Sequence, residues 1–147
     1  AVMKKIVLLC LFVVFAFSKS TFSDPQPSFI EPRKVVFQIF DSDEKRVNHN
    51  LSSMYNILKE YPAESLKISV VVYGNGMRAL KKDYNKDILK RIESLMEYEV
   101  EFIGCKNTME TMNWTKKDFI DNITYVQAGI VELIEKKVDG YVGVIAY

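Results

Sequence analysis

The stretch Val100-Glu101-Phe102-Ile103-Gly104-Cys105-Lys106-Asn107-Thr108 decides the fold that we expect for this chain. Its first part is mostly apolar and predicts a buried strand, and its second part is polar and predicts the turn that leaves the strand. Two earlier runs have the same layout: Lys34–Phe40 leads into polar residues 41–46, and Leu66–Tyr73 leads into Gly74-Asn75-Gly76. We therefore expect Cys105 at the end of a strand within a sheet.

Segments with helical spacing of apolar residues separate these strands. Pro62 should end the first helix and Gly140 the last, because proline cannot continue a helix and glycine favours its C-terminal cap. The expected helical segments are residues 47–61, 77–80, 86–97, 115–118 and 128–137, and the expected later strands are residues 123–126 and 141–146. This alternation predicts an α/β fold, a three-layer sandwich with a five-stranded, mostly parallel sheet and helices on both faces.

The first residues have the layout of a secretion signal. Lys4 and Lys5 precede the apolar run Ile6–Phe17, and small residues follow. The run has about a dozen residues, whereas a membrane span needs roughly 18–20. We predict a signal peptide over residues 1–23, cut after Ser18, Ser20 or Ser23, with an uncut membrane anchor as the alternative. Residues 24–33 are then a proline-rich linker, residues 34–147 form the domain, and the protein is periplasmic or secreted by a bacterium.

Charge and composition narrow the classes of function. The formal net charge of the 147 residues is +1, and the predicted signal peptide contains three lysines and no acid. The remaining domain is mildly acidic and has no basic block, which argues against a nucleic-acid partner. One histidine and two cysteines do not make a closed zinc site within one chain, and we expect no metal and no cofactor.

Cys105 is the main candidate for chemistry, because Cys10 lies in the predicted signal peptide. A lone thiol in an oxidising compartment has no internal partner, so it packs in the core, reacts, or joins another subunit through a disulfide. Lys106 or an adjacent helix N-terminus would favour the thiolate. Because ligands bind outside the carboxyl ends of parallel strands, this position favours a reactive thiol.

The other polar positions have alternatives. Gly74-Asn75-Gly76 is an incomplete phosphate-loop signal, and a tight strand exit with positive φ is the simpler interpretation. His49 and Asp41 would complete a Cys-His-Asp arrangement with Cys105, but their spacing does not demand it. The acids at residues 41, 43 and 44 suit the start of a helix better than a metal site.

Bulky residues follow the cysteine. Trp114, Met109 and Met112 either wall an apolar pocket over the thiol or pack in the core or against another subunit.

Three segments together resemble the DsrE/DsrF-like family of small sulfur-relay proteins. Residues 100–109 match its "V-x-F-x-x-C-x-N-T-M" strand and loop. Residues 126–134 with Asp139-Gly140-Tyr141 match its closing helix and strand. Tyr73-Gly74-Asn75-Gly76 resembles its "H-G-x-G" turn, with Tyr73 in place of histidine. The opening run from Lys34 also fits. The resemblance covers nearly all of the predicted domain.

The resemblance implies a parallel-sheet α/β sandwich that assembles as a homo-oligomer, a trimer or a hexamer, with sulfur donor and acceptor proteins or small sulfur species as partners. It places a persulfide on Cys105. Asn107 and Thr108 would shape the loop and hydrogen-bond a sulfur anion. Gly74, Asn75 and Gly76 would support this loop. Because Tyr73 stands where the family has histidine, the resemblance does not imply a histidine-assisted step in this chain. The leading hypothesis is an exported sulfur-trafficking protein, a carrier or a sulfurtransferase.

Three alternatives stay open from the sequence. A non-catalytic module would bind a small ligand at the strand ends and use Cys105 only for packing. An assembly protein would bury Trp114, Met109 and Met112 against neighbouring subunits. A flavodoxin-like cofactor protein is less well supported, because no Ser/Thr-rich phosphate loop follows the first strand.

Overall fold

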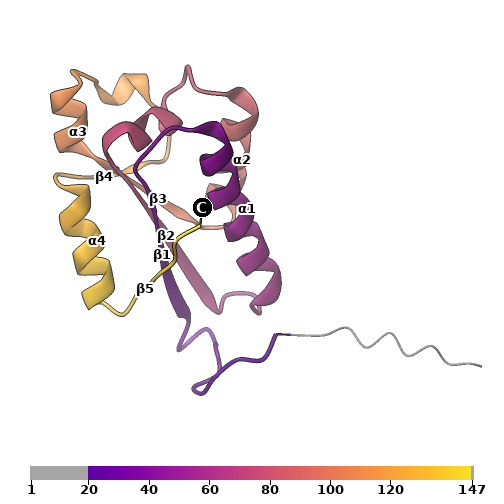
Figure 1. Ribbon diagram of the computed structural model, residues 1–147. Coiled ribbons are helices and arrows are strands. Elements are labelled where there is room, and N and C mark those ends of the chain that lie inside the picture. Colours follow the sequence, from indigo (N-terminus) through magenta and orange to yellow (C-terminus); the bar gives the residue numbers. More distant parts are fainter. Residues whose placement is uncertain (1–19, 147) are drawn as a thin grey trace, which may run out of the picture.

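Five parallel strands form one sheet in the computed structural model of this protein, which describes residues 20–146 (Figure 1). Their order across the sheet is β4-β3-β2-β1-β5. The strands are β1 (Arg33–Ile39), β2 (Leu66–Val72), β3 (Glu101–Cys105), β4 (Thr124–Val126) and β5 (Val142–Gly143). The predicted α/β fold with a five-stranded sheet is confirmed, and every strand pair is parallel.

The two longest described helices begin at residues whose side chains cap them. Asp43 caps α1 (Glu44–Glu60) by accepting the backbone N–H of Arg46, and α1 ends at Glu60, with Tyr61 as its C-cap just before Pro62. Asn85 caps α2 (Lys86–Glu97) in the same way. The remaining helical elements are η1 (Gly74–Leu80), α3 (Lys106–Thr111), η2 (Lys116–Asp118) and α4 (Gly129–Val138).

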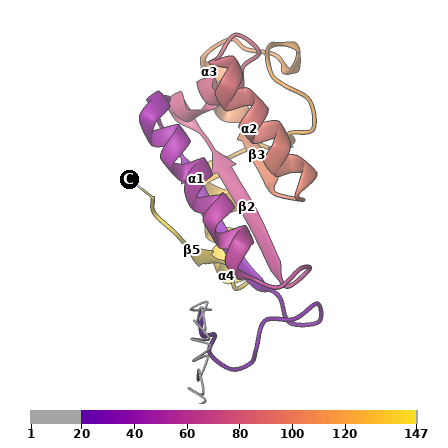
Figure 2. The same cartoon turned by 90° about the vertical axis from the view of Figure 1, so that its right-hand side faces the viewer.

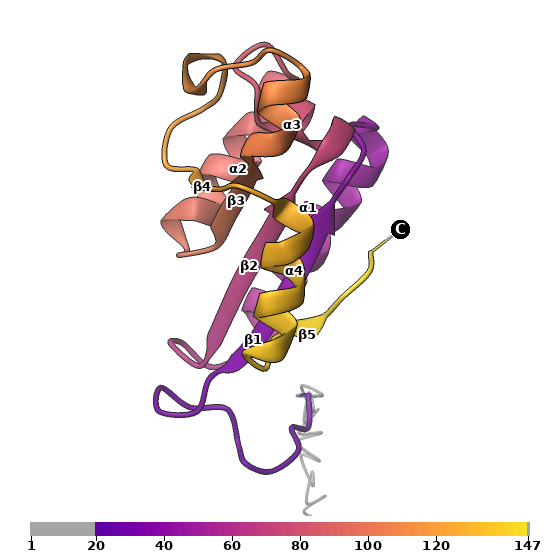
Figure 3. The same ribbon diagram turned by 90° about the vertical axis from the view of Figure 1, so that its left-hand side faces the viewer.

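Helices cover both faces of the sheet, as expected. Alternate residues of the central strands point to opposite faces: Phe37 and Phe102 belong to a large core under α1 and α2, whereas Ile103 belongs to a smaller core that Leu133 of α4 covers. In Figure 1 the sheet lies between α4 on one side and α1 and α2 on the other, and in Figure 3 α4 lies in front of the sheet. The second face is thus covered by a single ten-residue helix within the described residues.

The connections after β3 and β4 run to opposite faces of the sheet. The segment that follows β3 contributes Met109, Phe119 and Ile120 to the core on the α1 side, whereas the segment that follows β4 forms α4 on the other side. Adjacent strands whose connections diverge define the topological switch point, where open parallel sheets bind ligands. Cys105 pairs with Val126 at this point.

Several boundaries differ from the sequence-based expectation. The last strand was expected over residues 141–146, but β5 pairs with β1 only at Val35 and Val36, and one further bond runs from Val144 N–H to the Val36 carbonyl before the chain diverges. Such a short edge strand exposes few unpaired backbone groups. The polar turn after Cys105 is helical, as α3, because its residues hydrogen-bond within one turn.

No helix or strand lies between Ser20 and Pro32, and β1 begins at Arg33, the last residue of the segment predicted as a linker. Most of the predicted signal peptide lies outside the described residues. Among residues 20–146, the structure contains no helix that is both long enough and apolar enough to cross a membrane.

Candidate functional site

Cys105 ends β3, and its side chain lies between two chain segments that meet at the switch point. The residue is buried, with 5% of its surface exposed. Gly129 N–H, in the first turn of α4, donates to Cys105 Sγ at 3.3 Å, and the thiol lies 3.8 Å from the carbonyl oxygen of Gln127. The thiol therefore faces a hydrogen-bond donor that a thiolate would accept and an acceptor that a neutral thiol would use.

Gly129 is the residue that allows this contact. A Cβ atom at this position would lie 3.2 Å from Cys105 Cβ and 3.1 Å from Tyr73 Cβ, which is tighter than ordinary side-chain contacts. The absence of a side chain brings the positive end of the α4 dipole directly against the sulfur. The sequence analysis did not place Gly129 at the site, although a glycine at the start of an otherwise apolar helix was the available signal.

Thr108 links the cysteine to the end of β2. Its Oγ1 atom accepts the backbone N–H of Gly74 at 2.9 Å, and the Thr108 hydroxyl is one of the groups that lower the pKa of Cys105. Gly74 has φ of 55°, the left-handed conformation that glycine adopts without strain. The structure thus brings Gly74, from the turn after β2, to the loop that holds Cys105 and Thr108.

Asn107 contacts Gln127, in the segment after β4, through both its backbone and its side chain. Its N–H donates to the Gln127 carbonyl at 3.0 Å, and its side-chain oxygen accepts from Gln127 Nε2 at 2.6 Å. Gln127 Nε2 also donates to a Glu110 carboxylate oxygen at 3.2 Å. The side-chain amide of Asn107 therefore connects α3 to the segment that follows β4 and does not point at the sulfur. This contact fits the predicted role of Asn107 in shaping the loop.

Asn75 and Gly76 lie apart from the thiol. Asn75 is exposed, and Gly76 is buried where η1 passes the end of β1. A Cβ atom on Gly76 would lie 2.1 Å from the Ile39 carbonyl oxygen. Of the three residues in the Gly74-Asn75-Gly76 turn, Gly74 is the one that contacts the cysteine loop, and Gly76 serves the packing of η1 against β1.

The electrostatic balance favours the thiolate of Cys105. Burial is the largest single effect and raises the pKa of the thiol, but it is outweighed by hydrogen bonds from the backbone of Gly129, from the backbone and hydroxyl of Thr108, and from the backbone of Asn107. The net pKa lies below that of an ordinary thiol. These donors, and not the ammonium group of Lys106, account for the lowered pKa.

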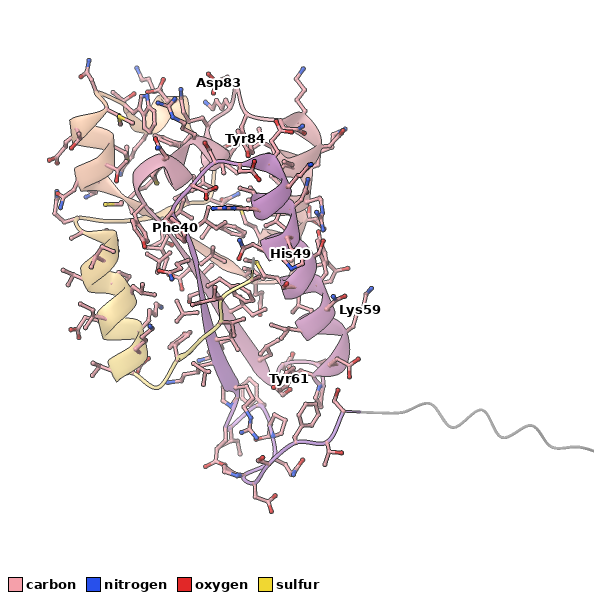
Figure 4. All side chains as sticks on the ribbon, in the orientation of Figure 1. Phe40, His49, Lys59, Tyr61, Asp83 and Tyr84 are labelled. Atoms are coloured by element: carbon pink, nitrogen blue, oxygen red, sulfur yellow. The ribbon has the colours of Figure 1, made fainter. Side chains whose placement is uncertain are left out.

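The other candidates lie elsewhere. His49 is exposed on α1, the helix on the opposite face of the sheet from α4 (Figure 4). Asp41 forms an ion pair with Arg46 at 2.7 Å and accepts the backbone N–H of Asp43. Because these side chains have other partners or another location, the structure does not support a Cys-His-Asp arrangement.

The bulky residues after Cys105 pack on the α1 side. Met109 is buried, and the Trp114 ring makes an edge contact with Phe119 at 5.9 Å between centroids. Arg78 and Lys81 lie 5.1 and 4.9 Å from the centre of the same ring. This cluster belongs to the core and its rim, so it does not wall a pocket over the thiol.

Tyr73 stands where the family turn has histidine. Its hydroxyl donates to Gln38 Oε1 at 3.1 Å, and burial raises its pKa. The hydroxyl is therefore directed toward β1 and stays protonated at neutral pH. Among residues 20–146 no group of three or more His, Cys, Asp or Glu side chains is placed to hold a metal ion.

Replacing Thr108 with valine should raise the pKa of Cys105, because the hydroxyl that donates to the sulfur is lost while the side-chain shape is kept. The midpoint of the pH profile for alkylation by iodoacetamide should move to higher pH, and the rate at pH 7 should fall several-fold. Thr111→Val is the matched control, since Thr111 Oγ1 bonds the Asn107 carbonyl and not the thiol. Equal profiles for the two variants would contradict this role.

Comparisons with known proteins agree with this geometry. The model of the DsrE/DsrF-like family matches residues 34–144. A search of curated proteins finds no match. Among solved structures, the chain is similar to MTH1491 of Methanobacterium thermoautotrophicum, a protein of unknown function, with TM-score 0.70, 26% identity, and coverage of 76% of this chain and 97% of that one. YchN of E. coli has the same fold, with TM-score 0.62, 15% identity, and coverage of 78% and 99%.

Proposed function

This chain belongs to the DsrE/DsrF-like family, and from this premise we propose that it is an exported sulfur-trafficking protein. It would carry sulfane sulfur as a persulfide on Cys105 and pass it to a partner. The observation that carries the proposal is the thiol at the switch point, with Gly129 N–H and the Thr108 hydroxyl directed at its sulfur and its pKa lowered. The family membership supports a sulfur-relay role in general.

The transfer is a displacement at sulfur. The Cys105 thiolate attacks the outer sulfur of a persulfide or polysulfide, a new S–S bond forms, and the S–S bond of the donor breaks. The electron pair of that bond leaves with the donor thiolate, or with sulfite when the donor is thiosulfate. Sulfane sulfur moves from one sulfur atom to another, so no external oxidant or reductant is needed.

The same geometry suits delivery. An acceptor thiolate attacks the outer sulfur of the persulfide, and the Cys105 thiolate is the leaving group. A thiolate of low pKa leaves faster, because its negative charge is already stabilised. Donors aimed at Sγ therefore assist both halves of the cycle, which is what a carrier requires.

Burial sets a preference among donors. Because Cys105 is only 5% exposed, small inorganic sulfur anions should reach it more readily than the thiol of a folded protein. A protein donor or acceptor would need the segment around Gln127 to move aside. We expect export to the periplasm or medium, and a homo-oligomer remains the expected state.

Intact mass tests the proposal. Wild-type protein exposed to polysulfide or thiosulfate should gain about 32 Da per sulfur, and reductant should reverse the gain. Alkylation of the thiol beforehand should prevent it. A protein with no adduct, whose thiol also resists alkylating reagents while folded, would show that Cys105 only packs.

The surface of α4 favours a second candidate, an assembly module. Four of its apolar side chains are about half exposed or more, namely Ile130 (49%), Val131 (55%), Ile134 (53%) and Val138 (76%). Contiguous apolar surface on a soluble domain often marks an interaction site. An inert thiol together with loss of a complex on Ile134→Ser would favour this function over sulfur transfer.

A further inference from the structure

The segment before β1 forms an arm that projects from the end of the sheet opposite Cys105 (Figure 2). We define this N-terminal arm as residues 20–32. Arg33 holds it in place, because its Nη1 atom donates to the Pro25 carbonyl at 2.9 Å and its other terminal nitrogen donates to the Ser23 carbonyl. The arm lies outside the residues that match the family, so it is a feature of this chain and not of the shared domain.

The tip of the arm presents two large apolar side chains. Ser28 N–H donates to the Glu31 carbonyl at 3.2 Å, and Glu31 N–H donates to Ser28 Oγ at 3.1 Å. This closed turn holds Phe29 and Ile30 between its ends, with 77% and 88% of their surfaces exposed. A preformed turn reduces the entropy that ordering would cost on binding. The tip therefore has the properties of a binding element without an occupant in its own chain.

An apolar groove lies at the same end of the molecule, beneath the C-terminal ends of α1 and α2. Its volume is about 530 Å³, and Tyr55, Leu58, Tyr61, Pro62, Leu66 and Tyr98 form its apolar lining. Tyrosine supplies large, rigid contact area and is enriched at interfaces. The groove is accordingly suited to apolar side chains.

The arm already shows how an aromatic ring binds at the edge of this groove. Phe22 stacks on Tyr61 in the same chain, with ring centroids 4.6 Å apart. Phe29 and Ile30, further along the same arm, stay exposed and leave the groove unfilled. Each copy of the chain thus carries a projecting apolar tip and an apolar groove at one end, and the tip does not fill the groove of its own copy.

We propose that two copies exchange arms, with Phe29 and Ile30 of each seated in the tyrosine-lined groove of the other. A two-fold axis makes both contacts equivalent, so a single pair of surfaces is used twice, as in isologous dimers. The tip survives in every form that the predicted signal cleavage would leave, because all three candidate cuts precede Asp24. A two-fold contact is compatible with a dimer or a hexamer, whereas a trimer contains none.

Sedimentation velocity over a range of concentrations tests the exchange. The wild-type protein should show a dimer whose dissociation constant rises about tenfold or more in Phe29→Ser/Ile30→Ser and in Tyr98→Ala. The arm variant should keep its fold, since both side chains lie outside the core. Val142→Ser/Ile145→Ser is the matched control, because it removes two apolar side chains of similar exposure, 64% and 71%, from a different surface.

Disulfide trapping tests whether the arm tip of one copy meets the groove of the other. In a background without Cys10 and Cys105, a mixture of Ile30→Cys and Tyr98→Cys proteins should form a mixed dimer at least tenfold faster than either protein alone. A monomer at every concentration, a dimer lost only in the Val142→Ser/Ile145→Ser control, or a mixture that forms the mixed dimer no faster than either protein alone forms a dimer would each overturn the proposal.

Discussion

Cys105→Ser should abolish sulfur uptake and delivery completely. A serine hydroxyl is not ionised at neutral pH and does not attack sulfane sulfur, so the mass gain expected for the wild type should be absent. The fold should persist, because serine is close in size and its oxygen can accept the Gly129 N–H that now reaches the sulfur. Intact mass after exposure to polysulfide, read beside the thermal unfolding curve, checks both expectations.

Two controls make this result decisive. Thr111→Val, on the same short helix but without contact to the thiol, should take up sulfur at the wild-type rate. Protein that retains the signal segment should be studied with Cys10→Ser, so that Cys105 is its only thiol. A sulfur adduct that survives in Cys105→Ser would place the chemistry elsewhere and would refute the proposed carrier.

Gly76→Ala should be the most damaging single-methyl change. The new Cβ would lie 2.1 Å from the Ile39 carbonyl oxygen, 2.5 Å from its carbonyl carbon and 2.9 Å from the Phe40 nitrogen. These are backbone atoms of β1 and of the residue after it, so they cannot turn aside as a flexible side chain can. We expect a loss of about 3 kcal/mol or more in the free energy of unfolding, a large part of a domain's stability. Urea denaturation measures it.

Gly143→Ala is the matched control for this prediction. Its Cβ would meet only the end of the Lys137 side chain, at 3.1 Å, and that side chain can move. The change in unfolding free energy should stay within about 0.5 kcal/mol. If Gly76→Ala were as mild as Gly143→Ala, the close passage of η1 against the end of β1 would be wrong.

The sulfur site shows how far sequence reasoning reaches. The apolar run before Cys105 and the polar residues after it placed the thiol at a strand end, because burial of β-branched and aromatic residues sets where strands begin and stop. The same reasoning named Lys106 or an adjacent helix N-terminus as the group that would favour the thiolate, and the first turn of α4 is such an N-terminus. The structure assigns that effect to Gly129 at the start of α4 and to Asn107 and Thr108 of α3, so the donors come from two segments that flank β4 in the sequence.

The three-residue turn after β2 shows what the sequence predicts correctly and what it does not predict. The sequence predicted a tight exit that needs glycine, and Gly74 has the expected positive φ. Gly76 has a different reason for being glycine, its contact with Ile39 in β1. Residues 39 and 76 are far apart in the chain, so local pattern alone cannot reveal their approach.

The sequence by itself determined the α/β class, most helix and strand positions, and the place of Cys105 at the end of a strand. It did so because hydrophobic periodicity, prolines, glycines and caps act over a few residues. The tertiary structure alone decided the strand order, the switch point between β3 and β4, and the approach of Gly129 to the sulfur. These depend on packing between segments more than twenty residues apart, and that packing sets the pKa of the thiol.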